Sequence, residues 1–121
     1  MSLSQILVDI TKERERQDAK FGPQRHQDSV HPNPFFLDQT AATADQLAMW
    51  YGIPTEEDAK RRTDSRFRNG EGTWADILVE ELAEAVGAAL KSREELREEL
   101  VQVAAVAVAW IEDLDSREET S

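Results

Sequence analysis

Hydrophobic residues in this chain recur at the three- and four-residue spacing of an α-helix, and no segment keeps the two-residue alternation of a β-strand. Leu, Ile, Val and Phe make up only 27 of the 121 residues, so any core is thin, but 15 alanines allow helices to pack closely. We therefore predict an all-α bundle of four to five helices, completed by dimerisation. The whole chain, 1–121, is expected to be one domain, with 23–72 as a variable insert of loop and short helices and 115–121 as a frayed tail.

Glycine, proline and capping residues mark where the expected helices begin and end. Gly22 and Pro23 end the first one, because glycine favours a helix C-terminus and proline cannot continue a helix. Thr55, Thr73 and Ser92 are placed to cap three later helices, and Ser92 begins a Ser-x-x-Glu capping box. The expected helices cover residues 4–20, a short segment from Asp38 or Thr40 to Gly52, and residues 55–67, 74–90 and 93–114.

Composition excludes several classes of protein. The formal net charge of -11 and a pI near 4.6 argue against a general nucleic-acid binder and against binding to anionic membranes. The chain has no cysteine, which excludes disulfides, thiolate metal sites and a cysteine nucleophile. The longest apolar run, residues 103–111, is too short to span a membrane, and the first residues lack the features of a signal peptide. We expect a cytoplasmic protein.

The acidic residues are concentrated in the second part of the chain. Residues 1–70 carry 10 basic and 11 acidic groups, whereas residues 71–121 carry 4 basic and 14 acidic groups. The apolar run at 103–111 lies in this acidic part and is hydrophobic around the whole helix, which predicts burial on nearly every side. An uneven distribution of this kind indicates that some of the acidic groups have a specific role.

Five oxygen-bearing side chains are predicted to share one side of a pair of helices. Glu80, Glu81 and Glu84 fall on one face of the helix expected at 74–90, and Glu99 and Gln102 fall on the face of the next helix that leads into its apolar run. Two antiparallel helices joined near residue 91 would place these two faces opposite each other. Carboxylates packed together between helices repel one another unless a cation neutralises them.

Oxygen ligands without histidine or cysteine suit a hard cation, namely Mg²⁺ or Mn²⁺. Mg²⁺ commonly shares its coordination shell with substrate phosphates, so such a cluster is suited to a triphosphate. The simpler interpretation of a Glu-Glu-x-x-Glu segment is a solvated helix face. The second acidic element on the next helix favours the metal site.

Residues 79–84 read Val-Glu-Glu-Leu-Ala-Glu, and residues 99–102, which follow after a 14-residue gap, read Glu-Leu-Val-Gln. This pair resembles the Glu-Glu-x-x-Glu … Glu-x-x-Asp signature of the MazG-like, all-α nucleoside triphosphate pyrophosphohydrolases. Residues 73–78 and 13–22 are also similar to a branch of that family. The resemblance covers most of the chain, and residues 23–72 match only loosely.

The resemblance implies a dimeric or larger helical assembly that hydrolyses a nucleoside triphosphate to monophosphate and pyrophosphate with Mg²⁺. Glu80, Glu81, Glu84 and Glu99 match the metal-binding carboxylates of the family. Gln102 stands where the family usually has Asp, and its amide oxygen can ligate a hard cation without contributing charge.

An Mg²⁺-bound water is expected to attack the α-phosphorus, with Glu81 or Glu84 assisting as the catalytic carboxylate. Lys20 and Arg16 are candidate contacts to the substrate phosphates, and Trp74 is a candidate for stacking on the base, although each residue type is more often an ordinary surface or rim residue. The alternative function is a non-catalytic helical module that binds a partner protein or a nucleotide without hydrolysing it.

Overall fold

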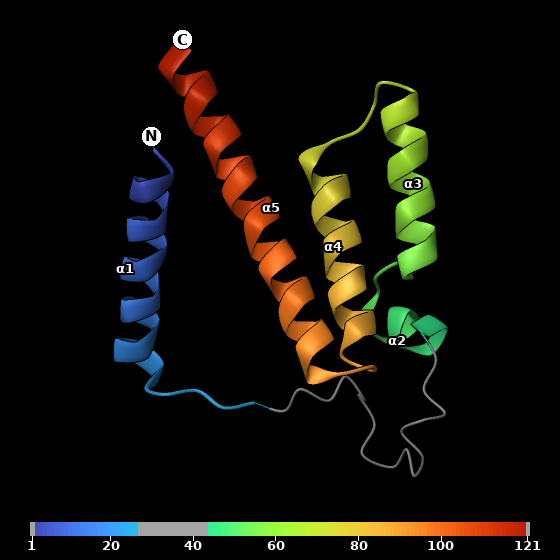
Figure 1. Ribbon diagram of the computed structural model, residues 1–121, viewed down its shortest axis with the longest axis horizontal. Helices are drawn as coiled ribbons and strands as arrows, with labels where there is room; N and C mark the ends of the chain where they lie inside the picture. The colour runs from blue at the N-terminus through green and yellow to red at the C-terminus, as the bar shows by residue number, and fades with distance from the viewer. Residues whose placement is uncertain (1, 27–43, 121) are drawn as a thin grey trace. The chain divides into compact units, whose positions relative to one another are not determined.

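The computed structural model describes residues 2–26 and 44–120 (Figure 1). Five α-helices and no β-strand are present within these two ranges, which confirms the predicted all-α class. None of the helices in the described ranges is both long and apolar enough to cross a membrane. The helices are α1 (Leu3–Phe21), α2 (Ala44–Tyr51), α3 (Glu56–Arg68), α4 (Trp74–Ala88) and α5 (Arg93–Thr120).

The helices fall into two compact units, and the expectation of a single domain stays a prediction. One unit contains α1 and the part of α5 after residue 106, and the other contains α2, α3, α4 and the earlier part of α5. The division is possible because α5 has 28 residues. At 1.5 Å per residue such a helix is about 42 Å long, which is enough to take part in two separate units.

Helix α1 begins and ends where the sequence predicts. The Ser2 hydroxyl accepts a hydrogen bond from the Gln5 amide at 3.2 Å, and Gly22 ends the helix with a φ of +70° that favours glycine. Ile6 is the one buried hydrophobic side chain of this helix, whereas Leu3 and Leu7 each remain 49% exposed. The predicted apolar stripe of α1 is therefore only partly covered.

Helices α3 and α4 are held together by a polar network at the turn between them. Arg66 Nε donates to Asp76 Oδ2 at 2.8 Å, and the Thr63 hydroxyl donates to the Asp76 carbonyl oxygen at 3.3 Å. Thr73 and Asp76 form a complete capping box at the start of α4. The predicted cap at Thr55 is also confirmed, because its hydroxyl accepts from the Asp58 amide at 3.1 Å.

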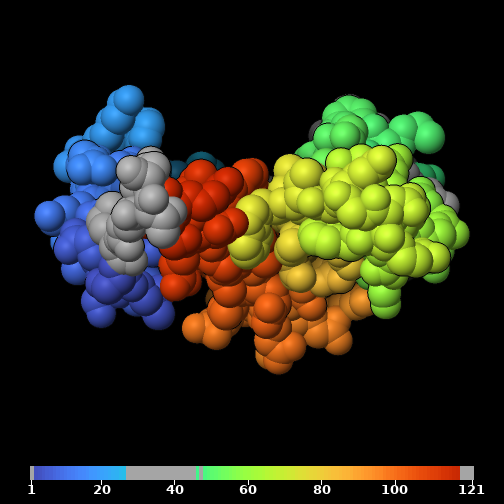
Figure 2. All heavy atoms as spheres, turned by 90° about the horizontal axis from the view of Figure 1, so that it is seen from above, coloured from blue at the N-terminus to red at the C-terminus, as the bar shows by residue number. Residues whose placement is uncertain are grey.

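The core of this unit consists of small side chains. Five of its buried residues are alanines, as expected for a chain with few large hydrophobic residues. In the space-filling view the atoms of α3 lie directly against those of α4 (Figure 2). Close approach of helix backbones therefore replaces interdigitation of large side chains. The buried residues of the unit are Ala48, Ala59, Thr63, Ala83, Ala85 and Ala88.

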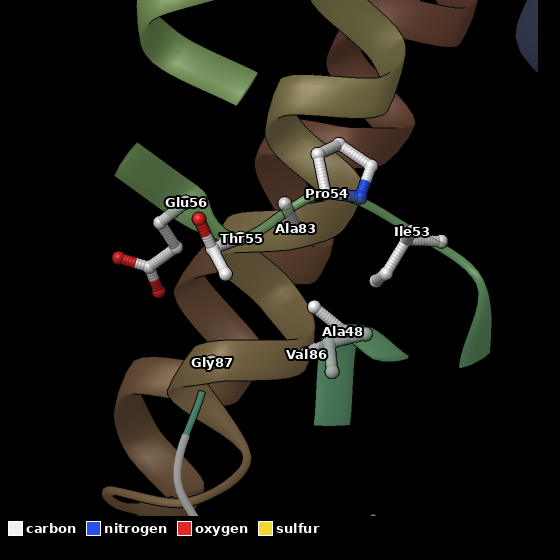
Figure 3. Close-up of a pocket in the computed structure, with 8 residues that line it drawn as sticks. All are labelled: Ala48, Ile53, Pro54, Thr55, Glu56, Ala83, Val86 and Gly87. Atoms are coloured by element: carbon white, nitrogen blue, oxygen red, sulfur yellow. The ribbon is translucent and has the colours of Figure 1, made fainter. Parts of the chain in front are cut away.

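A small cavity lies where α2 and the start of α3 meet α4 (Figure 3). Its volume is about 10 Å³, which is close to the minimum that one water molecule needs and far too small for a nucleotide. Gly87 contributes backbone to its wall, and a Cβ there would collide with the Glu56 carboxylate. This cavity is a small gap in the packing of the helices, and it cannot hold a nucleotide base.

Helix α5 extends beyond its predicted end at residue 114 and continues to Thr120, so residues 115–120 are helical and the expected frayed tail is not observed there. Residues 93–120 contain no glycine or proline that would stop the helix. Ser116 and Arg117 each donate a side-chain hydrogen bond to the Asp113 carbonyl oxygen, at 2.9 and 3.3 Å. These bonds add side-chain partners for a carbonyl near the end of the helix.

The apolar run of α5 is not buried on nearly every side, so that prediction is wrong for the single chain. Ala104 and Ala105 are exposed, and the remaining residues of 103–111 are half-buried. Leu100 and Val101, just before the run, are each 51% exposed. Within the described ranges, this part of α5 therefore keeps accessible surface.

Candidate metal site on α4 and α5

Two capped helices place three carboxylates side by side. The capping box at Thr73 starts α4, so that Glu81 and Glu84 lie three residues apart on one of its faces. The Ser92 hydroxyl accepts from the Glu95 amide at 3.1 Å and so caps the start of α5, as the sequence predicts. Glu99 lies in the second turn of α5. The short connection at 89–92 turns the chain back and brings Glu99 to the two glutamates of α4.

One carboxylate oxygen from each of Glu81, Glu84 and Glu99 lies within 4.8 Å of the other two. All three side chains are half-buried. Glu81 Oε2 and Glu99 Oε2 are shielded from solvent and have no hydrogen-bond donor within the ranges that the structure describes. Buried carboxylate oxygens without a donor are costly, so these two oxygens are suited to a cation.

The cluster also raises the proton affinity of its members. Burial, followed by the negative charges of Glu81 and Glu99, raises the pKa of Glu84 to about 7. Burial, followed by the charge of Glu99, raises the pKa of Glu81. Near neutral pH the three carboxylates therefore carry fewer than three full negative charges. A bound divalent cation would reverse this effect by favouring the ionised forms.

The donor set fits a hard divalent cation. It consists of carboxylate oxygens only, and hard cations such as Mg²⁺ and Mn²⁺ prefer oxygen ligands. Two of these oxygens have no other partner in the described chain. Glu81, Glu84 and Glu99 could therefore hold Mg²⁺ or Mn²⁺. Exposed acidic clusters occur in many proteins without a metal, so the buried, unpartnered oxygens are the distinguishing feature.

The structure brings together three of the five predicted ligands. Glu80 is half-buried on α4 and lies outside the group of three, although its charge adds to the raised pKa of Glu84. Gln102 is exposed on α5, one turn after Glu99. The two remaining predicted ligands are thus neighbours of the cluster in sequence without belonging to its compact arrangement.

The predicted substrate contacts are distributed over both units. Arg16 and Lys20 lie on α1, where Arg16 Nε pairs with Glu13 at 2.9 Å and Lys20 Nζ lies 5.2 Å from the centre of the Phe21 ring. Trp74 is the first residue of α4 and is half-buried. It precedes Glu81 by seven positions, a rise of about 10 Å along the helix.

Two alanines of α4 lie next to the cluster in sequence. Ala85 follows Glu81 by four residues and Ala88 follows Glu84 by four, and both are buried. Residues four apart are neighbours on a helix surface, so the α4 surface one turn after Glu81 and Glu84 is buried.

No protein-family model, no curated protein and no solved structure matches this chain. The motifs and the carboxylate cluster are therefore the features that bear on its function.

Proposed function

We propose that this protein is a metal-dependent pyrophosphohydrolase that converts a cytoplasmic nucleoside triphosphate to monophosphate and pyrophosphate. The observation that carries the proposal is the cluster of Glu81, Glu84 and Glu99, in which two buried oxygens have no hydrogen-bond donor within the described chain. The resemblance of residues 79–84 and 99–102 to the MazG-like signature supports the same chemistry.

Each carboxylate has a distinct role in the proposal. Glu81 and Glu99 hold the cation with their otherwise unpartnered oxygens. Glu84 would accept a proton from the attacking water, because a bound divalent cation would keep this carboxylate ionised at neutral pH. Bound Mg²⁺ supplies charge neutralisation at the phosphate oxygens. In-line attack at the α-phosphorus then expels pyrophosphate.

The other predicted residues contribute to the same proposal. Glu80 strengthens the negative field of the cluster, and Gln102 offers a neutral amide oxygen. Lys20 and Arg16 are the proposed phosphate contacts, and Trp74 is the proposed contact to the base. The active form is a homodimer or a larger homo-oligomer, which is supported by the exposed apolar residues of α1 and α5.

The second candidate function is a helical module that binds a partner protein or a nucleotide without hydrolysing it. The exposed position of Gln102 and the absence of Glu80 from the compact group favour this alternative, because fewer than five ligands then converge. A module of this kind would bind Mg²⁺ weakly or not at all.

The deciding experiment is a nucleotide panel with Mg²⁺ or Mn²⁺ and identification of both products. We expect release of pyrophosphate and a monophosphate from at least one triphosphate, and loss of that release in Glu84→Gln. Glu98→Gln is the matched control, because Glu98 is exposed on α5 next to Glu99. An inert panel together with no divalent-cation binding would reject the enzyme and leave the module.

A further inference from the structure

An asparagine followed by a glycine forms the turn directly after α3. Asn69 is the C-cap of the helix, with φ of -89° and ψ of 3°, and Gly70 follows with a φ of +75°. The Gly70 amide donates to the Phe67 carbonyl oxygen at 3.2 Å. The Glu71 amide donates to the Arg66 carbonyl oxygen at 2.8 Å. These two bonds form a Schellman motif, which needs a left-handed residue after the C-cap and therefore favours glycine there.

The Asn-Gly pair is open to solvent. Both residues are exposed, and the Asn69 side chain has no hydrogen-bond partner among the residues that the structure describes. A Cβ placed on Gly70 would meet no atom of the described chain within 4 Å. The bond from the Gly70 amide, at 3.2 Å, is at the long end of the usual range. Base and water therefore reach the Gly70 amide once this one bond opens.

The pair has the composition that favours ring closure between a side chain and the next backbone nitrogen. Glycine has no side chain to obstruct the approach, and it leaves the backbone free to rotate. Base removes the proton of the Gly70 amide, and the nitrogen then bonds to the side-chain carbonyl carbon of Asn69. The bond from that carbon to its NH₂ group breaks, and ammonia leaves after taking up a proton from water. The product is a cyclic imide.

Water opens this imide at either of its two carbonyl carbons. Attack at the side-chain carbon breaks its new bond to nitrogen and gives aspartate. Attack at the main-chain carbon breaks the original peptide bond and gives isoaspartate, in which the chain runs through the former side chain and is one carbon longer. Both products carry one more negative charge than asparagine.

We propose that Asn69 is a site of spontaneous deamidation and that its isoaspartate product loosens the connection between α3 and α4. The added main-chain carbon lies between Arg66 and Glu71, which are also joined by a bond from Arg66 Nη2 to the Glu71 carbonyl oxygen at 2.9 Å. Arg66 Nε donates to Asp76 at 2.8 Å, so a displaced turn disturbs the ion pair between the two helices. The inference goes beyond the proposed enzymatic function and involves none of the clustered glutamates.

The chain contains its own comparison for this reaction. Its other asparagine, Asn33, precedes Pro34. The nitrogen of proline carries no hydrogen within a peptide bond, so it cannot lose a proton and close the ring. We therefore expect deamidation at Asn69 and none at Asn33.

Ageing the purified full-length chain at mildly alkaline pH tests the site. Peptide mapping by mass spectrometry should show, at Asn69, the mass increase that accompanies replacement of NH₂ by OH, and the rate should rise with pH. Isoelectric focusing should show an acidic form that accumulates in parallel. The aged chain should accept methyl groups from an isoaspartyl methyltransferase. Asn69→Gln should lose these signals, because its side chain is one carbon longer and closes a ring far more slowly.

Asn69→Asp separates the two consequences of the reaction, because it adds the negative charge without lengthening the main chain. We expect the isoaspartate form, purified from the aged wild type, to melt at a lower temperature than freshly prepared Asn69→Asp. Fresh wild type and Asn69→Gln provide the reference melting temperatures.

Three results would overturn the proposal. An unchanged mass at Asn69 in the folded chain, under conditions in which the urea-unfolded chain reacts, would show that the Schellman motif protects the pair. An equal mass increase and methylation in Asn69→Gln would place the reaction at other residues. An isoaspartate form that melts as Asn69→Asp does would reject the effect on the turn. Pyrophosphate release by the acidic cluster is measured separately and can succeed or fail independently of the deamidation.

Discussion

Asp76 and Glu84 are carboxylates on the same helix, eight residues apart, and their surroundings have opposite effects on them. Asp76 accepts hydrogen bonds from Arg66, from the Thr73 amide and from the Thr73 hydroxyl, and the Arg66 bond is the main reason that its pKa is lowered. Glu84 is half-buried near other glutamates, and burial, followed by the charges of Glu81 and Glu99, raises its pKa to about 7.

The difference separates a structural carboxylate from a candidate functional one. Asp76 accepts hydrogen bonds from Arg66 and Thr73, and the bond from Arg66 links α3 to α4. The cluster around Glu84 brings further acids together and leaves two buried oxygens without a donor in the described ranges. Perturbation by burial and like charges is typical of sites that bind or react, although structural groups can show it too.

The largest expected effect concerns activity. Glu84→Gln should lower pyrophosphate release by at least about a hundredfold, because a positioned general base contributes a factor of this order. Asp76→Asn, at the other carboxylate, should leave the rate per folded molecule nearly unchanged. Steady-state assays at a temperature where both variants are folded measure this. Equal losses in the two variants would remove the functional distinction between them.

The next effect concerns divalent-cation binding. Adding Mg²⁺ should raise the melting temperature of the wild type, because a ligand of the folded state at a hundred times its Kd stabilises it by about 2.7 kcal/mol. Glu99→Gln should lose most of this response, since it removes the charge of one member of the cluster. Chelation should reverse the shift, and Glu98→Gln should respond as the wild type does. A response that Glu99→Gln retains in full would place the cation elsewhere.

In the absence of divalent cations, Glu84 and Asp76 should also have opposite effects on how the free energy of unfolding changes with pH. Between the ordinary value of 4.5 and about 7, Glu84 holds its proton in the folded state and releases it on unfolding, so rising pH destabilises the fold. Asp76, with a lowered pKa, contributes stability above its ordinary value of 3.8 and loses it as pH falls below that value. Denaturant titrations of the wild type, Glu84→Gln and Asp76→Asn measure both slopes.

The decrease with rising pH should be smaller in Glu84→Gln than in the wild type. An unchanged slope in that variant would assign the pH dependence to other groups.

The smallest effect concerns the structural carboxylate and its cap. Thr73→Ala should lower the free energy of unfolding by about 1 kcal/mol through loss of the N-cap. Asp76→Asn should cost more than Thr73→Ala, because it weakens both the cap and the ion pair with Arg66. Neither change should alter the melting-temperature shift caused by Mg²⁺. Urea unfolding with and without Mg²⁺ provides the measurement, and an altered shift would show that the two carboxylates are coupled.

Local sequence signals predicted most helix boundaries correctly. Gly22 ends α1, Thr55 and Thr73 precede α3 and α4, and Ser92 precedes α5, each through a backbone or side-chain bond formed within a few residues. The caps expected at Asp38 and Thr40 lie outside the described residues. The sequence predicts the end of α5 too early, because the polar composition of 115–121 favours fraying whereas no glycine or proline there interrupts the helix.

The candidate site could be predicted in part. Helical spacing put Glu81 and Glu84 on one face, and the expected reversal of the chain near residue 91 put Glu99 opposite them, as the structure has it. The same reasoning included Glu80 and Gln102, which lie outside the compact group. Angular position on a helix is a property of sequence, whereas the rotation of one helix against another depends on packing.

The sequence by itself determined the helical class, the caps, the small-residue composition of the core and the acidic segment that holds the candidate ligands. These features depend on residue type and on spacing within one helix, which the chain carries wherever it folds. Tertiary structure alone decided which three carboxylates converge, which acid receives Arg66, and that the apolar run of α5 stays partly exposed. Those outcomes depend on distances between segments far apart in sequence, and only packing of the helices sets such distances.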